Sequence, residues 1–233
     1  MAHIITIANE KGGSAKTTTA LNLAGAFAET GKRVLLVDTD PQGTASYWRG
    51  MRPEADQPFQ VVSMAQPVVH KQLPEMMRDS SWDYAVVDCP PGGPRGEKNI
   101  TRSGMAAADM IIVPMSPSPA DLWSFQNTQM MLDMLVSQYQ RRFVCRILIS
   151  RKIPNTKLGR EAHQAASSFG VGIFQSEITQ RIGIAESLLE GQTIVQYAPQ
   201  SSGADEFRRL AEEVEVVLKE GQPYQLSATT AAI

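Results

Sequence analysis

Short apolar runs rich in β-branched residues alternate along the chain with longer segments of helical periodicity. Two of these runs, Val34–Val37 and Ala85–Val87, are continuously apolar rather than alternating. Continuous apolar strands are typical of parallel sheets that are covered on both faces. The pattern predicts strands at residues 3–8, 33–37, 84–87, 110–113 and 143–149.

Helical periodicity fills the segments between the predicted strands. A helix is expected over residues 16–29, where Gly31 is placed to end it, and others over 121–138, 158–169 and 205–218. Repeated strand–helix–strand units form right-handed crossovers. We therefore predict an α/β fold, with a doubly wound, mainly parallel sheet flanked by helices. Such sheets bind ligands beyond the carboxyl ends of their strands.

The domain organisation follows from the length and from the composition of the chain end. Neither an internal repeat nor a linker divides the 233 residues, so one domain over residues 1–220 is expected. Residues 221–233 are rich in Ser, Thr, Ala and Pro, which predicts a flexible C-terminal tail.

Charge and cysteine content exclude some classes of protein. The formal net charge is −2, so any affinity for nucleic acid must come from a local patch. The two cysteines, Cys89 and Cys145, are far apart and fit buried strand positions better than a disulfide or a zinc site. We see neither a signal peptide nor an apolar stretch that could span a bilayer, and expect a reducing, cytoplasmic location.

Candidate chemistry begins where the first predicted strand ends. The segment Lys11-Gly12-Gly13-Ser14-Ala15-Lys16-Thr17-Thr18 lies between a strand and a helix, which is the context of a phosphate-binding loop. Its glycines allow backbone N–H groups to face an anion at a helix N-terminus. Lys16 is expected to reach the β- and γ-phosphates, and the Thr17 hydroxyl to complete a Mg²⁺ shell.

Carboxylates follow two other predicted strands. Asp38 and Asp40 come at the end of the second strand, and Asp88 ends the apolar run at Tyr84–Val87, as in a Walker B motif. These ends share one edge of a parallel sheet with the phosphate-binding loop, so the pattern predicts a Mg–nucleotide site there.

Together these motifs resemble a known family. The K-G-G-x-x-K-T loop, the D-x-D-P-Q-G segment from Asp38 and the V-V-D-C-P-P strand from Val86 are similar to those of ParA/MinD deviant Walker-box ATPases, P-loop NTPases of the SIMIBI type. The resemblance covers residues 3–218, including 112–119, 149–153 and 178–181. It looks most like the small plasmid-partition ATPases of the ParF kind.

The resemblance implies a homodimer that sandwiches ATP and Mg²⁺. It implies that Lys11 reaches the partner's phosphates, that Asp40 orients the attacking water, and that Asp38 and Asp88 lie around Mg²⁺. Catalysis is then expected from Lys11, Lys16 and Asp40. The resemblance implies a nucleotide site made of Lys11, Gly12, Gly13, Ser14, Ala15, Lys16, Thr17, Thr18, Arg151 and Pro199.

One residue of the loop departs from the family pattern. Ala15 stands where the family usually has glycine. Its Cβ lies close to the expected phosphates, so it either crowds the loop and weakens binding or is tolerated with a shifted backbone.

Basic residues dominate the chain between residues 141 and 181, where relatives bind DNA non-specifically. We expect Arg151, Lys152, Lys157 and Arg181 to contact DNA phosphates without reading sequence. Two alternatives stay open: scattered solvated arginines, and an Arg151 that packs on adenine. No helix-turn-helix precedes the first strand, so operator-specific binding is not expected.

Membrane attachment is not expected, because the 205–218 helix has an apolar stripe opposite a largely acidic face and fits a core-packing role. A cluster of Met130, Met131 and Met134 also fits the core better than a partner surface.

Two classes of function remain. The first is a nucleoid-associated positioning ATPase that works with a ParB-like or other adaptor and carries a plasmid or a protein compartment such as the carboxysome. The second is an ATP-dependent small-molecule synthetase of the same fold. Lys11 favours the first, because a lysine that acts across a dimer makes hydrolysis depend on dimerisation.

Overall fold

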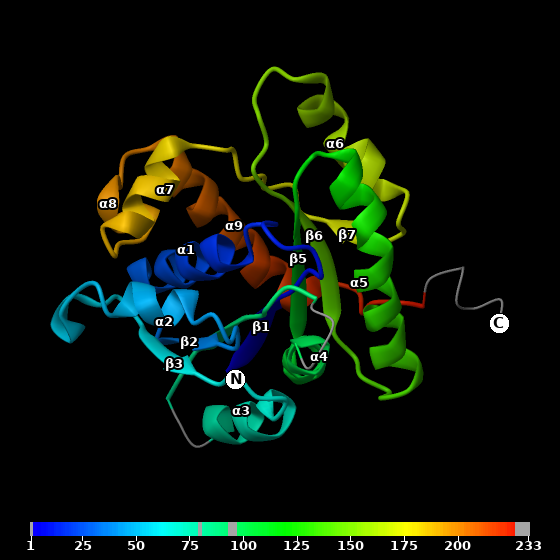
Figure 1. Cartoon of the computed structure of the whole chain (residues 1–233), viewed down its shortest axis with the longest axis horizontal. Coiled ribbons are helices and arrows are strands. Elements are labelled where there is room, and N and C mark those ends of the chain that lie inside the picture. Colours follow the sequence, from blue (N-terminus) through cyan, green and yellow to red (C-terminus); the bar gives the residue numbers. More distant parts are fainter. Residues whose placement is uncertain (1, 79–80, 93–96, 227–233) are drawn as a thin grey trace.

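The computed structural model describes residues 2–78, 81–92 and 97–226, with the backbone alone for residues 97 and 98. The described chain forms a seven-stranded parallel sheet in the order β3-β2-β4-β1-β5-β6-β7 (Figure 1). The strands are β1 His3–Ile7, β2 Val34–Asp38, β3 Gln60–Ser63, β4 Tyr84–Asp88, β5 Met110–Met115, β6 Val144–Ile149 and β7 Gly172–Ile173. The predicted fold class is confirmed.

Helices cover both faces of this sheet (Figure 1). On one face pack α1 (Lys16–Glu29), α2 (Thr44–Arg49), α7 (Ile182–Leu189), α8 (Ile194–Tyr197) and α9 (Ser202–Glu220). On the other pack α3 (Val69–Arg78), α4 (Glu97–Ala107), α5 (Pro119–Ser137) and α6 (Lys157–Ser167). A short 3₁₀ turn, η1, spans Glu54–Asp56.

The predicted strands and helices are present, with ends that shift by up to three residues. The first helix begins and ends where the periodicity places it, at Lys16–Glu29. The pattern missed β3 and β7, because β3 has exposed polar ends and β7 has two residues. It also missed five helices, namely α2, α3, α4, α7 and α8.

The C-terminal helix α9 packs on the core as predicted. Phe207, Leu210 and Val214 are fully buried on its inner face. Glu206 on the same helix is 6% exposed, and it accepts hydrogen bonds from the Thr179 N–H and the Arg181 guanidinium. A buried carboxylate needs such partners, and these tie α9 to the segment before α7.

The cysteines and the methionine cluster are both expected in the core. Both cysteines are buried and unpaired, as predicted. The methionine cluster is only partly in the core, because Met131 is 8% exposed but Met130 is 67% exposed.

Part of the expected flexible tail lies against the domain, because the Tyr224 hydroxyl donates to Asp133 at 2.8 Å and the Tyr224 ring stacks on Phe143. Residues 227–233 of the tail lie outside the described chain. Within the described residues, no helix is long and apolar enough to cross a bilayer.

Candidate nucleotide site

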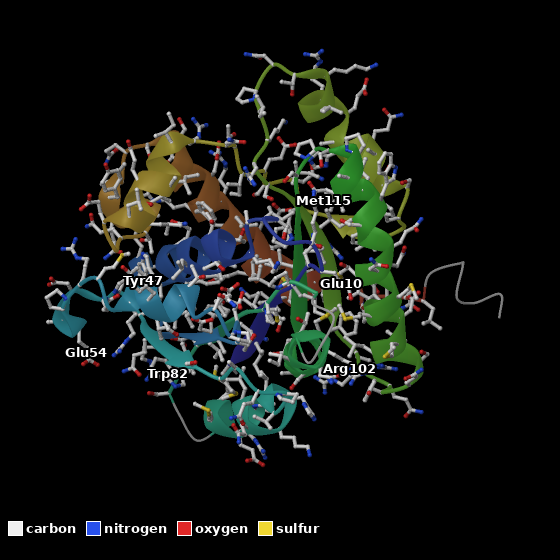
Figure 2. The ribbon with its side chains drawn as sticks, in the orientation of Figure 1. Glu10, Tyr47, Glu54, Trp82, Arg102 and Met115 are labelled. Carbon is white, nitrogen blue, oxygen red and sulfur yellow. The ribbon has the colours of Figure 1, made fainter. Side chains whose placement is uncertain are left out.

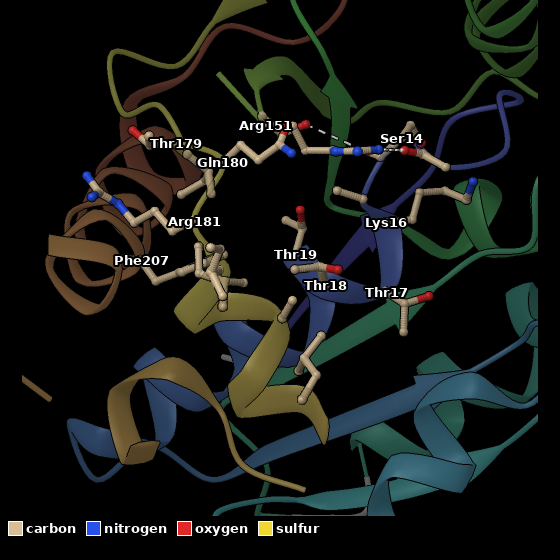
Figure 3. Close-up of a pocket in the computed structure, with 18 of the residues that line it drawn as sticks. Ser14, Lys16, Thr17, Thr18, Thr19, Arg151, Thr179, Gln180, Arg181 and Phe207 are labelled. Atoms are coloured by element: carbon tan, nitrogen blue, oxygen red, sulfur yellow. Dashed lines mark hydrogen bonds between the residues drawn. The ribbon is translucent and has the colours of Figure 1, made fainter. Parts of the chain in front are cut away.

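The loop between β1 and α1 is held by side chains that engage its carbonyl groups (Figure 3). Lys16 Nζ donates to the Lys11 carbonyl at 3.0 Å, and Arg151 Nη1 donates to the Gly13 carbonyl at 2.9 Å. Ser150 Oγ approaches the Ser14 carbonyl at 3.4 Å. These contacts fix the carbonyl side of the loop.

The N–H groups of Gly13, Ser14 and Ala15 donate to no acceptor in the described chain. Gly13 and Ala15 both adopt the left-handed conformation, with φ of 74° and 68°, and Ala15 caps α1 without a side-chain hydrogen bond. Alternating handedness of this kind makes a concave nest of N–H groups at a helix N-terminus, which suits a phosphate. Burial lowers the pKa of Lys16, and the negative charge of Asp88 opposes that fall.

Asp88 and Thr17 form the second part of the site. Asp88 ends β4, is fully buried, and forms no ion pair with a described residue. Burial raises the pKa of Asp88 to about 7, and the Thr17 hydroxyl opposes this rise. A buried carboxylate with no cationic partner is costly. The Asp88–Thr17 pair therefore fits the oxygen shell of a divalent cation beside the loop.

Asp38 and Asp40 lie side by side in sequence but differ in their surroundings. Asp38 is fully buried, and its Oδ2 accepts from both the N–H and the hydroxyl of Ser46 at 2.7 Å. Its Oδ1 accepts from the Asp40 N–H at 3.2 Å. Asp40 is half-buried and lines the nucleotide pocket. Asp38 thus fixes the loop that carries Asp40, and its own oxygens are already engaged.

A pocket of about 1020 Å³ opens from the loop (Figure 3). Loop residues 12–19, Asp40 and Arg151 form one wall, and the opposite wall is mostly apolar, with Ile178, Ile182 and Phe207. This combination suits phosphates at one end and a base and sugar at the other. Pro199 is not among the described residues that line it; its carbonyl instead accepts from Arg208 at 2.7 Å, so the structure does not place Pro199 at the nucleotide.

Lys11 lies on the other side of the loop from this pocket. It is not among the described residues that line the pocket, and its ammonium pairs with Asp121 Oδ1 at 2.8 Å. The lysine side chain is 33% exposed, whereas Asp121 is 3% exposed at the start of α5. The two basic residues of the loop are thus separated, with Lys16 facing inward and Lys11 facing the surface.

The residues predicted to contact DNA are largely engaged in the fold. Lys152 pairs with Glu177, Lys157 with Glu161 at 4.0 Å, and Arg181 with Glu206 at 2.7 Å. Arg151 is occupied by the Gly13 carbonyl. Lys157 and Glu161 are one turn apart on α6, whereas tertiary structure brings Glu177 to Lys152 and Glu206 of α9 to Arg181, which a count of charges along the sequence does not show.

Asp121, Ser46 and Ser150 are site residues that the sequence reasoning missed. Each contacts a predicted site residue from a different element: Asp121 holds Lys11, Ser46 holds Asp38, and Ser150 approaches the loop. Ser46 lies eight residues after Asp38, and only the short α2 brings it back. A serine at that spacing after the carboxylate is a weak signal, and Asp121 carries none in sequence.

The geometry defines a P-loop nucleotide-binding protein, and comparison with known proteins agrees. The family described as the CobQ/CobB/MinD/ParA nucleotide binding domain matches residues 5–194. The chain therefore belongs to that family, whose ParA/MinD members are ATPases.

Individual relatives are similar over nearly the whole chain. A chromosome-partitioning ATPase Soj from Thermus thermophilus is 33% identical over 90% of this chain and 94% of its own length. A maintenance of carboxysome distribution protein A from Halothiobacillus neapolitanus is 28% identical over 91% and 96%. The septum site-determining protein MinD of Pyrococcus horikoshii, solved with Mg-ADP, superposes with a TM-score of 0.71 at 24% identity, over 92% of this chain and 96% of MinD. Likeness to the ParF kind in particular stays a prediction.

Proposed function

We propose that this protein is a ParA-type ATPase that dimerises around Mg-ATP, associates with DNA without sequence preference, and positions a cargo through an adaptor protein. Relatives named for chromosome partitioning and for carboxysome distribution support this class of function. The cargo that we propose is therefore either a DNA molecule or a protein compartment.

The observation that carries the proposal is the position of Lys11. Lys16 already supplies the cation on the pocket side of the loop, where its ammonium donates to the Lys11 carbonyl. Lys11 points away from its own pocket to the surface, where Asp121 holds it at 2.8 Å. We infer that a second loop lysine on that side serves the phosphates of another subunit. Its charge would then stabilise the transferring phosphoryl group across the dimer.

The other site residues fit Mg-ATP. The free N–H groups of the loop and Lys16 would bind the phosphates, and Thr17 and Asp88 would hold Mg²⁺, which neutralises charge on the β- and γ-phosphates when bound. Asp40 lies on the pocket wall, where a carboxylate can accept a hydrogen bond from a water and orient it. Asp38 would act by positioning Asp40.

Light scattering and phosphate release on two variants test the dimer. We expect Lys11→Ala to bind Mg-ATP and remain monomeric, because the charge that crosses the interface is gone. We expect Asp40→Ala to bind ATP, accumulate as a dimer, and hydrolyse it about 10²–10⁴-fold more slowly. Lys219→Ala, which removes an exposed lysine from the end of α9, is the control and should behave as the wild type.

If Lys11→Ala dimerises normally with ATP, Lys11 has no role across the interface, and the site acts within a single subunit. Lys16→Ala provides a separate check of the loop, because loss of the buried cation should abolish nucleotide binding in calorimetry.

The synthetase alternative remains open because the matching family also includes the CobQ/CobB branch. The position of Lys11 outside the pocket argues against it, since a synthetase brings its small substrate to the phosphates of one subunit. Retention on DNA-cellulose in the presence and absence of ATP separates the two classes. Retention that requires ATP supports the positioning ATPase, and no retention in either state favours the synthetase.

A further inference from the structure

The basic side chains of the described chain differ in whether a carboxylate holds them in an ion pair. Those predicted for DNA, after β6, are paired or engaged, as described above. Five others form no ion pair with a described carboxylate, and we name them the α3–α4 basic patch. They are Lys71, Arg78, Arg102, Arg141 and Arg142.

Contacts between elements bring α3, α4 and the segment before β6, which carry these five residues, to one side of the molecule. The His70 N–H and ring both approach Ser103 Oγ, the ring at 2.8 Å, which joins α3 to α4 beside Lys71 and Arg102. The Arg102 guanidinium reaches Met134 Sδ on α5 at 3.9 Å. The Arg141 guanidinium reaches the Ala108 carbonyl, after α4, at 3.5 Å.

The same side of the molecule has a hollow, and three cations of the patch act on one histidine there. Arg78 and Arg141 line a hollow of about 720 Å³ at the amino ends of β1 and β4, together with Arg33. The pKa of His70 is lowered by burial and then by the positive charges of Lys71, Arg102 and Arg141. Three cations from three segments thus act on one imidazole.

Within the part of the chain that the structure describes, acidic groups on this side are few and mostly engaged. Asp83 and Asp109 line the hollow, but Asp83 accepts from the Arg33 N–H and Asp109 accepts from the Ile4 N–H. Glu75 is the exposed acid on α3. Among the described side chains, the five cations without an ion pair outnumber these acids, although the whole chain has a net charge of −2.

We propose that the α3–α4 basic patch, rather than the basic residues after β6, contacts the phosphates of duplex DNA. This proposal rests on the proposed function, which includes DNA association, and says where that association occurs. Cations without an ion pair bind a phosphate backbone without first leaving a carboxylate, whereas Lys152 and Arg181 must give up theirs.

The patch lies apart from the nucleotide chemistry. None of its five residues lines the nucleotide pocket or the hollow that contains Lys11. Figure 2 shows Arg102 and Trp82 at the lower end of the view, with Glu10 and Met115, at the carboxyl ends of β1 and β5, above them. DNA on the patch therefore leaves the Lys11 side free for a second subunit. A dimer carries two patches, and such bivalency makes DNA affinity depend on ATP.

Two triple variants with the same loss of charge test the proposal. Lys71→Ala/Arg78→Ala/Arg142→Ala removes three exposed cations from the patch. Lys152→Ala/Lys157→Ala/Arg160→Ala removes three from the region after β6 and spares Arg181, whose loss would leave Glu206 buried without its partner. Binding to a random-sequence duplex is measured by fluorescence anisotropy with Mg-ATP across a salt series, and light scattering with ATP checks that each variant still dimerises.

We expect the patch variant to lose about 10-fold or more in affinity, with a salt slope smaller by about 2–3, since each phosphate contact contributes about 0.9 to that slope. The control should stay within about twofold of the wild type. A control that loses affinity while the patch variant retains it would overturn the patch and leave the proposed function intact. A wild-type protein that binds no DNA in any nucleotide state would overturn both. Binding to anionic phosphatidylserine vesicles but not to duplex, lost in the patch variant, would assign the patch to a lipid surface instead.

Discussion

Ala15 shows how one residue of the loop stores strain. It has a φ of 68°, in the left-handed region, where a side chain costs about 1–2 kcal/mol. The structure therefore favours the second of the two expectations from sequence: the loop keeps its nest with alanine present, at a cost in backbone energy.

We expect Ala15→Gly to raise the free energy of unfolding by roughly 0.5–1 kcal/mol, because relief of the strain exceeds the entropy that glycine adds to the unfolded chain. Gly13→Ala is the matched comparison, since Gly13 has a φ of 74° and open space around its missing Cβ. It should lower stability by about 1 kcal/mol through conformation alone. Urea unfolding of both variants gives the measurement, and an Ala15→Gly protein less stable than the wild type would show that the alanine is not strained.

The individual site residues were predictable where the motif itself fixes their position. Lys16, Thr17 and Asp40 line the pocket as the spacing from β1 and β2 indicates. Asp121 was not predictable, because the Lys11–Asp121 pair joins residues 110 positions apart through the packing of α5 beside the loop. The role of Pro199 stays a prediction, and tertiary structure places its carbonyl against Arg208.

Among the elements, α1 connects the phosphate loop to the rest of the domain. Gly25 on this helix faces Thr193, and a Cβ there would lie 2.7 Å from the threonine side chain. Asn22, one turn earlier, accepts from the Ile194 N–H at 2.7 Å. The close approach of α1 to α8 thus requires a residue without a side chain at position 25.

We expect Gly25→Ala to destabilise the protein by about 1–3 kcal/mol, because overpacking outweighs the higher helix propensity of alanine. Gly183→Ala on α7 is the control: its new Cβ would meet Ile194 Cδ1 at an ordinary 3.9 Å, so it should gain roughly 0.5–1 kcal/mol. The midpoints of urea unfolding compare the two. Equal midpoints would mean that α8 moves aside without cost.

The long apolar strands were predictable from sequence because burial on both faces leaves a continuous run, as at Val34–Val37. The edge strands β3 and β7 were not, since few of their residues are buried and their pairing depends on strands already in place. Pro74 inside α3 also hid that helix, although it lies within the helix as observed.

At the scale of the whole molecule, charge was the property that sequence described least well. Lys152 pairs with Glu177 and Arg181 with Glu206 of α9, and only the fold brings these distant residues together. The α3–α4 basic patch arises in the opposite way, from residues up to 71 positions apart, Lys71 to Arg142, that share one side. The fold class, by contrast, follows from periodicity alone.

The Lys11–Asp121 ion pair within one subunit opposes formation of the proposed dimer. Asp121 is nearly buried, and it keeps the Lys11 ammonium within its own subunit at 2.8 Å. Lys11 must leave Asp121 before it can reach a partner's phosphates, so the pair competes with dimerisation. The same carboxylate also accepts from Ser118 Oγ at 2.7 Å at the start of α5, so a substitution there must be separated from a lesion of the helix cap.

We expect Asp121→Asn to tighten ATP-dependent dimerisation by several-fold, because the neutral amide keeps the shape of the side chain but removes the charge that holds Lys11. Ser118→Ala is the matched control, since it removes the N-cap hydroxyl of α5 and costs about 1 kcal/mol of stability without touching Lys11. Light scattering over a range of ATP concentrations measures both. The Asp121→Asn curve should shift to lower ATP while the Ser118→Ala curve stays with the wild type. Weaker dimerisation in Asp121→Asn than in Ser118→Ala would contradict this expectation. It would show that the Asp121 carboxylate supports the interface and stays paired with Lys11 in the dimer.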